Sequence, residues 1–349
     1  MHQPEDTIRV AIFGYGRHAE GVRVPPLLAM PDVRIVAVAD LNDDRLARAA
    51  ELPGPPRTYS DAMQMVEEQD IDILFSLTGP LARGPVECAA AARGAHIYTE
   101  KPQAHDIRIA VQMDEAVRSA GVMGEVGYRE RYRPLFQEAR SFLADKSIVH
   151  ARYHWAESRR PGRRRRTGRR PGSAIEWGCH ATDYLRFMTG LEIARAQAFH
   201  YWSEAAASPL SVSVNYQFEN GATATLGFPR CLHEPYDYAE RENPDGLPWF
   251  MLYYEGGYLA LHGYRKLVAN GEVIYEAEPF DPWREQIISF VEAVRRRDPS
   301  RHLADFHDCF RSIAAILAAW ESGERDGECI EVGAFVRGAQ MRTAESAGD

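Results

Sequence analysis

The sequence has 349 residues, enough for two domains, and its 45% hydrophobic and 26% charged residues are ordinary for a globular protein. No apolar run reaches the ~18 residues of a membrane span, and residues 1–6 lack the basic and apolar regions of a secretory signal. The five cysteines are scattered without a C-x-x-C pair, so neither a disulfide framework nor a metal site is expected. We expect a cytoplasmic protein without membrane contact.

The chain opens with a β-rich apolar run over residues 7–13 that ends in a glycine-rich turn. The turn follows the pattern G-x-G-x-x-A from Gly14 through Gly16 to Ala19, and a helix-like segment follows. The first glycine permits the tight turn, the second lets the backbone approach a pyrophosphate, and the helix start offers free N–H groups. The candidate cofactor contacts here are Gly14, Tyr15, Gly16, Arg17 and His18.

A second apolar run, residues 33–39, predicts the next strand and ends in Asp40. In dinucleotide-binding folds a carboxylate ~20 residues after the glycines hydrogen-bonds the ribose 2′-hydroxyl. The same carboxylate repels a 2′-phosphate, so the sequence favours NAD over NADP. A second interpretation is that Asp40 caps the helix predicted over residues 42–51.

The alternation of helices and strands continues to residue 126. Helices are predicted over residues 60–69 (capped by Ser60), 85–93 and 106–120, and strands over 72–77, 95–99 and 122–126. This rhythm predicts a parallel, doubly wound sheet, which binds ligands at the carboxyl ends of its strands. The candidate residues at those ends are Thr78, Pro80, Glu100 and Lys101. Pro102 disfavours helix at the preceding residue and holds Lys101 on a defined turn; the alternative is a surface lysine paired with Glu100.

The rhythm changes from about residue 128. Helices are predicted over residues 134–144, 173–188, 282–297 and 302–320, and strands over 149–158, 196–201, 211–218, 222–228, 249–255, 258–262 and 266–269. Turns such as Asn220-Gly221 between these strands indicate an antiparallel sheet with hairpins. We therefore predict a Rossmann domain over residues 1–127 and an α+β domain over 128–349, whose last helices could pack back on the first domain.

The helix predicted over residues 173–188 carries a second candidate cluster. Glu176 and His180 are four residues apart and share a face, and Asp183 lies three residues further on. A carboxylate beside a histidine can orient the imidazole, which is well suited to accept a proton near neutral pH. Gly178 would let a ligand approach the helix backbone. The alternatives are that Ser173 and Glu176 form a capping box and that His180 is structural.

Three motifs in order along the chain resemble those of the glucose–fructose oxidoreductase/inositol dehydrogenase (Gfo/Idh/MocA) family. They are the glycine-rich turn, Glu100-Lys101-Pro102, and a pattern like D-x-G-x-H-x-x-D over residues 176–183. The match runs over nearly the whole length. It implies a Rossmann domain, a second domain with an open, mainly antiparallel sheet, and a homodimer or homotetramer. It also implies NAD(P)-dependent oxidation of a secondary hydroxyl on a sugar, sugar derivative or cyclitol, or the reverse reduction.

Carried over by position, the resemblance implies that Lys101 and His180 are the catalytic pair. His180 would take the hydroxyl proton, Lys101 would hydrogen-bond the same oxygen, and Glu176 would orient His180. The expected substrate contacts are Tyr128, Arg129 and Asp183. The sequence departs from the family pattern at Glu176, where an aspartate is usual, and at Arg83, where a histidine is frequent.

The segment Arg159–Arg170 holds eight arginines in twelve residues, on a chain whose net charge is −9. It could clamp an anionic sugar, contact a neighbouring subunit, or be a solvated loop; we favour the last two. Nucleic acid is an unlikely partner because the remainder is acidic.

Two other functions compete with the dehydrogenase. One is a glycosidase that oxidises and re-reduces its substrate with bound NAD. The other is a non-catalytic NAD-binding sensor, against which the presence of both Lys101 and His180 argues.

Overall fold

The computed structural model describes residues 7–156, 173–203, 208–230 and 247–347, so the arginine-rich segment 159–170 lies outside the described residues. The chain divides into two compact units, Met1–Tyr132 with Asp281–Phe310, and Arg133–Phe280 with Arg311–Asp349. The functional division at residue 127 stays a prediction. Within the described ranges, no helix is long and apolar enough to cross a membrane, and no group of three or more His, Cys, Asp or Glu side chains could hold a metal ion.

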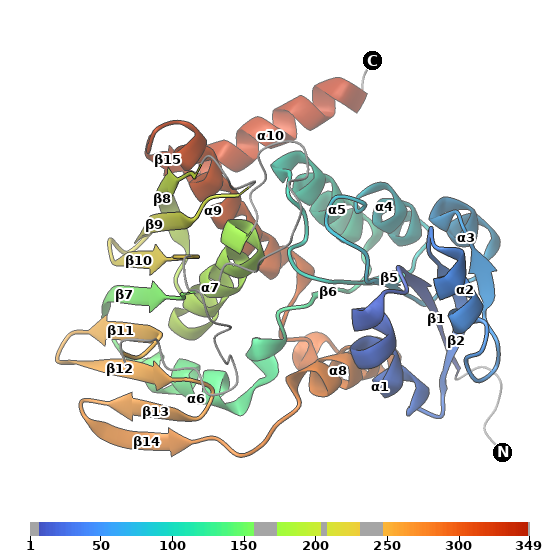
Figure 1. The fold of residues 1–349 in the computed structure, drawn as a ribbon, viewed down its shortest axis with the longest axis horizontal. Helices are drawn as coiled ribbons and strands as arrows, with labels where there is room; N and C mark the ends of the chain where they lie inside the picture. Colours follow the sequence, from blue (N-terminus) through green and yellow to red (C-terminus); the bar gives the residue numbers. More distant parts are fainter. Residues whose placement is uncertain (1–6, 157–172, 204–207, 231–246, 348–349) are drawn as a thin grey trace. The chain divides into compact units, whose positions relative to one another are not determined.

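Six parallel strands form the sheet of the first unit (Figure 1). In chain order they are β1 (Ile8–Phe13), β2 (Val33–Ala39), β3 (Arg57–Tyr59), β4 (Ile73–Ser76), β5 (His96–Thr99) and β6 (Gly124–Val126). Their spatial order is β3-β2-β1-β4-β5-β6. After β3 the chain crosses to the other side of β1 and continues with β4, which confirms the predicted doubly wound arrangement. In such sheets ligands bind at this switch point, at the carboxyl ends of the strands.

The helical segments of the first unit connect these strands or follow β6. They are η2 (Ala19–Arg23), α1 (Val24–Leu28), α2 (Asp43–Ala49), α3 (Ala62–Glu68), α4 (Pro85–Ala92), α5 (Ile107–Ala120), η3 (Arg129–Tyr132), α8 (Pro282–Arg296) and η4 (Pro299–Arg301). Two helix caps differ from the sequence-based expectation. Asn42, and not Asp40, accepts the Arg45 N–H at 3.0 Å, and Asp61, and not Ser60, accepts the Met63 N–H at 2.8 Å. A cap must reach an N–H two or three residues ahead, which these two side chains do.

Helix α8 completes the core of the parallel sheet although it lies some 180 residues further along the chain than β5. The Phe290 ring lies 6.4 Å from that of Phe75 on β4 and 6.1 Å from that of Tyr98 on β5. Ile287 and Val291 belong to the same buried cluster. A contact between segments so far apart leaves no local pattern in the sequence.

A buried ion pair joins β6 to the segment after α8. The Glu125 carboxylate accepts hydrogen bonds from the Tyr132 hydroxyl (2.9 Å) and the Gln286 amide (2.7 Å), and lies 3.0 Å from Nε2 of His302. The His302 and Glu125 side chains are 3% and 0% exposed. Burial opposes a charge on His302, but the carboxylates of Glu125 and Asp305 outweigh it and raise the pKa of the imidazole.

Nine strands form the mixed sheet of the second unit (Figure 1). They are β7 (Ile148–His154), β8 (Ile193–Tyr201), β9 (Ser211–Phe218), β10 (Thr223–Gly227), β11 (Phe250–Tyr254), β12 (Gly257–His262), β13 (Lys266–Ala269), β14 (Glu272–Glu276) and β15 (Ile330–Glu331), in the spatial order β14-β13-β12-β11-β7-β10-β9-β8-β15. Among the described strands of this second sheet, β7 and β10 form the one parallel pair, and the other neighbours are antiparallel. The prediction of a mainly antiparallel sheet is confirmed.

Four helices of the described residues belong wholly or mainly to the second unit. They are α6 (Pro134–Leu143), α7 (Ser173–Thr189), α9 (Phe306–Glu324), whose first residues belong to the first unit, and α10 (Val332–Ala347). Along β9, Val214 and Tyr216 are buried while Ser213 and Asn215 between them are exposed. The Tyr216 hydroxyl lies 2.9 Å from that of Thr182 on α7, so the buried face is the one under α7.

The sequence does not predict β3, β14, β15 or α10. Strands β3 and β15 have three and two residues, too few to show a period. Strand β14 is exposed along almost all of its length, so burial imposes no alternation on it. Helix α10 contains Gly333 and Gly338, which weaken its helical propensity.

The buried Glu125–His302 pair predicts a pH dependence of stability. The folded-state pKa of His302 lies above its unfolded value of about 6.5. The contribution of the pair is therefore complete below that pH and is lost as the pH rises through the folded pKa. We expect urea denaturation to show a larger loss of unfolding free energy for His302→Gln at pH 6 than at pH 9.

A matched control is His150→Gln on β7, because burial lowers the pKa of that imidazole. Its effect on stability should not decline between pH 6 and pH 9. An equal loss for His302→Gln at both pH values would contradict the assignment of a charged, buried pair.

Candidate active site

The glycine-rich turn brings the ends of three strands together. Gly14 follows β1 with a φ of +93°, a backbone conformation that favours glycine. A Cβ on Gly14 would lie 2.8 Å from the backbone nitrogen of Thr78, which follows β4. The Gly14 N–H donates to the carbonyl of Ala39 at the end of β2, at 2.8 Å. No larger residue fits at position 14, so the tight turn that a dinucleotide site requires is present.

Gly16 differs from Gly14 because it borders open space. The nearest atom to a Cβ on Gly16 would be Nη1 of Arg45, 4.0 Å away. A helical segment begins directly after the turn, and the Glu20 N–H donates to the Gly16 carbonyl at 3.0 Å. Free N–H groups at a helix start, with room beside a glycine, are suited to an anion such as a pyrophosphate.

Asp40 supports the turn from the side of β2. One carboxylate oxygen accepts the Tyr15 N–H at 2.8 Å and the other accepts the Asn42 N–H at 2.9 Å. The Arg45 guanidinium lies 3.2 Å from the same carboxylate, whose side chain is only 7% exposed. The carboxylate is thus fixed beside the turn, where a ribose hydroxyl would be expected.

Arg83 explains the departure from the family pattern after β4. Its guanidinium is 4% exposed and donates to the carbonyl of Thr78 at 2.5 Å. It also donates to the carbonyls of Glu100 and Pro102. Arg83 therefore ties the turn after β4 to the turn after β5. The Arg83 side chain thus satisfies backbone carbonyls of two turns, and no local sequence pattern around residue 83 indicates this.

Glu100 is held by charged neighbours within the first unit. Its carboxylate accepts Nε of Arg23 at 2.5 Å and lies 3.3 Å from Nε2 of His18 in the glycine-rich turn. Burial would favour its neutral form, but Arg23 and His18 outweigh it and hold the pKa of this carboxyl far below its usual range. Arg23 is 1% exposed and was not singled out in the sequence, because a lone arginine in a helix carries no motif.

Lys101 follows this anchored glutamate and precedes Pro102, with which it forms a cis peptide bond. The chain has only three lysines, Lys101, Lys146 and Lys266, among 41 basic Lys and Arg residues. A lysine is therefore a rare choice in this sequence, and one of the three stands at the carboxyl edge of the parallel sheet.

Tyr128 and Arg129 follow β6 at the same edge. The Tyr128 side chain is fully buried. The Arg129 guanidinium lies 4.2 Å from the ring centre of Trp283 and 3.1 Å from the Glu130 carboxylate. The role of these two residues as substrate contacts stays a prediction.

Helix α7 of the second unit packs closely on α9. A Cβ on Gly178 would lie 2.7 Å from Cδ1 of Ile316, so this glycine serves helix–helix packing and not ligand approach, which corrects the sequence interpretation. Asp183 is fully buried and accepts the Ser312 hydroxyl at 3.0 Å. This hydrogen bond links α7 to α9. The role of Asp183 as a substrate contact stays a prediction.

His180 lies within an aromatic cluster on α7. It is 1% exposed, and its ring centre lies 5.8 Å from that of Trp177 and 5.7 Å from that of Tyr184. Trp177 is half-buried and stacks on Trp155 at 5.3 Å. Glu176 is half-buried one turn before His180. Neither tryptophan was among the site residues predicted from the sequence.

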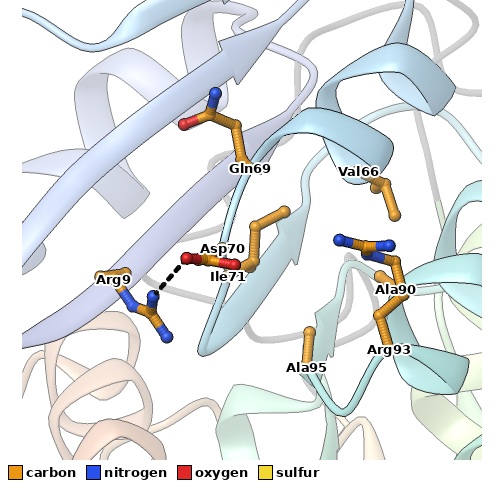
Figure 2. A pocket seen from close by; sticks show the side chains of 8 residues that line it. All are labelled: Arg9, Val66, Gln69, Asp70, Ile71, Ala90, Arg93 and Ala95. Carbon is orange, nitrogen blue, oxygen red and sulfur yellow. Dashed lines mark ion pairs between the residues drawn. The ribbon is translucent and has the colours of Figure 1, made fainter.

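A cavity of about 100 Å³ lies at the opposite edge of the parallel sheet (Figure 2). Its lining includes Arg9, Asp70 and Ala95, which stand at the amino ends of strands. Arg9 forms ion pairs with Asp70 at 3.3 Å and with Asp72 at 2.8 Å. Because these charges satisfy one another away from the glycine-rich turn, the cavity is not part of the candidate site.

The glycine-rich turn and the fixed Asp40 carboxylate give the first unit the features of a dinucleotide-binding domain. NAD fits the residues present, because Gly14 and Gly16 leave a tight turn with open space and Asp40 adds a fixed carboxylate. Residues 8–128 match the profile described as "Oxidoreductase family, NAD-binding Rossmann fold", and residues 136–259 match the GFO/IDH/MocA C-terminal domain. The chain belongs to the GFO/IDH/MocA family, which confirms the resemblance seen in its motifs.

Three individual proteins share 18–25% of their aligned residues with this chain. A scyllo-inositol 2-dehydrogenase (NAD(+)) of Bacillus subtilis is 25% identical over 198 residues, 54% of this chain and 56% of that protein. A D-apiose dehydrogenase of Paraburkholderia graminis is 25% identical over 336 residues, 90% of this chain and 87% of that protein. The crystal structure of an Agrobacterium radiobacter oxidoreductase with NAD+, L-tartaric acid and magnesium has a TM-score of 0.75 and 18% identity, covering 94% of this chain and 99% of that one.

The open space beside Gly16 predicts a separation of folding from cofactor binding. A Cβ at this position meets no protein atom within 4 Å except Arg45, but it would occupy the approach of a pyrophosphate. We expect Gly16→Ala to keep the wild-type melting temperature within about 2 °C and to weaken NADH binding by roughly tenfold or more, measured by NADH fluorescence.

Gly21→Ala is the matched control, because nothing lies within 4 Å of its Cβ position on the following helical turn. It should bind NADH like the wild type. Unchanged NADH affinity in Gly16→Ala would contradict the placement of the cofactor.

Proposed function

We propose that the protein is an NAD-dependent dehydrogenase that oxidises a secondary hydroxyl of a sugar, a sugar derivative or a cyclitol, or catalyses the reverse reduction. The observation that carries this proposal is the position of Lys101. It follows Glu100, whose carboxylate lies 3.3 Å from His18 of the glycine-rich turn. In a chain with three lysines, an ammonium group at the cofactor edge of the sheet points to chemistry at that edge.

In this proposal Lys101 and His180 act on one substrate hydroxyl. His180 takes the hydroxyl proton, and Lys101 hydrogen-bonds the same oxygen and stabilises its developing negative charge. Glu176, one helical turn before His180, orients the imidazole or a neighbouring hydroxyl. When bound, NAD supplies the acceptor for the hydride that leaves the carbinol carbon.

The substrate class is supported by two sources. The relatives include proteins named scyllo-inositol 2-dehydrogenase and D-apiose dehydrogenase. Trp177, half-buried beside His180 and stacked on the buried Trp155, exposes part of an aromatic ring, and aromatic side chains are common in the lining of small-molecule sites. A ring with one apolar face and several hydroxyls suits such a surface.

We also propose that the outward face of the second sheet joins two copies of the chain. A registered row of outward side chains, Gln197, Asn215, Thr225, Arg152 and Met251, crosses five adjacent strands. Asn215 and Thr225 at its centre are exposed, and short uncharged side chains permit close contact.

The catalytic assignment predicts that single substitutions stop turnover without removing the cofactor. General acid–base assistance is worth ~10²–10⁴-fold, so His180→Ala and Lys101→Met should each lower kcat by about that factor. Both should bind NADH like the wild type by fluorescence titration. Lys266→Met on β13 is the control and should retain normal turnover. Near-normal kcat in either active-site variant would overturn its assignment.

The substrate class is tested by NADH absorbance with NAD and NADP over cyclitols, free sugars, sugar phosphates, nucleotide sugars and aminosugars. Turnover of one class with NAD supports the proposal. Glycosidic cleavage without net NADH formation would instead indicate the recycling glycosidase. NAD binding without turnover in either direction would indicate the sensor.

The oligomer proposal predicts a mass that is a multiple of 39.3 kDa in light scattering. Thr225→Arg would place a long charged side chain at the centre of the outward face and should convert the protein to monomers. A monomeric wild-type protein at micromolar concentration would contradict this proposal.

A further inference from the structure

Two buried arginines fix the residues on either side of Lys101. Arg83 donates to the backbone carbonyl of Glu100, before the lysine, and to that of Pro102, after it. Arg23 binds the Glu100 side chain through Nε and Nη2, each 2.5 Å from the same carboxylate oxygen. The two arginines are 4% and 1% exposed, so neither belongs to the solvated surface charge of the chain.

Few donors reach the carbonyls of this turn from within the turn itself; the Thr99 hydroxyl donates to the Glu100 carbonyl at 3.4 Å. A buried carbonyl without a partner is destabilising, and Pro102 has no N–H to offer in return. A guanidinium presents five N–H donors in a rigid planar fork and can reach several carbonyls at once. Arg83 uses this fork on three carbonyls, those of Thr78, Glu100 and Pro102. A histidine or lysine could not reproduce this geometry.

The third carbonyl extends this link to the glycine-rich turn. Thr78 is the residue whose backbone lies against Gly14, within 2.8 Å of where a Cβ would be. Gly14 therefore contacts Thr78, Thr78 is bound by Arg83, and Arg83 holds both neighbours of Lys101. The backbone that carries Lys101 is thereby fixed relative to the turn that is expected to hold the cofactor.

We propose that Arg83 is a positioning residue for Lys101, which sets the lysine relative to the glycine-rich turn, and that Arg23 supports it through Glu100. This inference rests on the proposed function, in which Lys101 binds the reacting hydroxyl. A misplacement of a catalytic group by about 1 Å can cost ~10²-fold in rate, so a shift of the backbone that carries Lys101 is expected to slow the reaction. Arg83 acts through Lys101 and need not contact the substrate.

The kinetic test compares Arg83→Met with Arg93→Met, an exposed arginine at the end of α4. On the compound of the panel that is turned over fastest, we expect Arg83→Met to lower kcat ~10²-fold while the NADH dissociation constant changes less than about threefold. Added guanidinium chloride should restore part of the kcat of Arg83→Ala, whose small side chain leaves room for the ion, and none of that of Lys101→Met. Arg93→Met should behave like the wild type.

Arg83→Lys keeps the charge but loses the fork, and it covers the case in which Arg83→Met fails to fold. We expect it to fold with a lowered melting temperature, because carbonyls lose their donors, and to lose kcat ~10-fold or more. Wild-type kcat in Arg83→Lys would overturn the positioning role. A loss of kcat and NADH affinity in parallel, without guanidinium rescue, would also overturn it and indicate a general structural role.

The small number of lysines gives a readout that does not depend on activity. After ¹³C-dimethylation, the NMR spectrum should contain one signal for each of the three lysines and one for the N-terminal amine. Lys101→Arg assigns the signal of interest. We expect Arg83→Lys to add one signal, from the new lysine, and to shift or broaden the Lys101 signal. The signals of Lys146 and Lys266 should not change. An unaltered Lys101 signal would contradict the inference.

The two proposals fail in different ways. Normal turnover in Lys101→Met would overturn the proposed function and this inference with it. An inactive Lys101→Met beside a fully active Arg83→Met and Arg83→Lys would leave the proposed function intact and overturn the positioning role alone.

Discussion

The close approach of Gly14 to the backbone of Thr78 is the constraint on which the candidate site depends. It requires a residue without a side chain at the end of β1, directly beside the end of β4. That requirement exists because β1 and β4 are neighbours at the switch point of the sheet. The same edge carries Asp40 after β2 and Glu100 and Lys101 after β5, so one sheet topology collects residues that are as much as 87 positions apart.

At this edge two arginines bind the glutamate of the Glu100-Lys101-Pro102 motif. Arg23 and His18 hold the Glu100 carboxylate ionised although it is buried, and Arg83 satisfies the carbonyls around it. In the second unit, contacts between helices fix the helix that carries the candidate histidine. Asp183 and Ser312 link α7 to α9, and Gly178 allows the close packing against Ile316 that sets the depth of the helix. In both units, packing and paired polar groups fix the backbone that presents a candidate catalytic side chain.

Local patterns in the sequence were enough to predict the strand–turn–helix start, the parallel sheet and the helix that carries His180. These features repeat with a short period or follow a fixed spacing, as Gly14 and Gly16 do. The sequence could not predict contacts between distant segments, such as Phe290 against Phe75, or the three carbonyls bound by Arg83. The role predicted for Gly178, room for a ligand, was also wrong, because its packing partner Ile316 lies 138 residues further along the chain. Short or exposed elements such as β15 and β14 were missed because burial imposes no pattern on them.

The most direct test of the account is a crystal structure of the protein with NAD and a substrate or product identified by the turnover panel. The account predicts that Nζ of Lys101 and a ring nitrogen of His180 both lie within about 3 Å of one substrate oxygen. It also predicts that the adjacent carbon faces the nicotinamide at about 3–3.5 Å. A structure in which either side chain is directed away from the substrate would contradict the central claim that these two residues form one catalytic site.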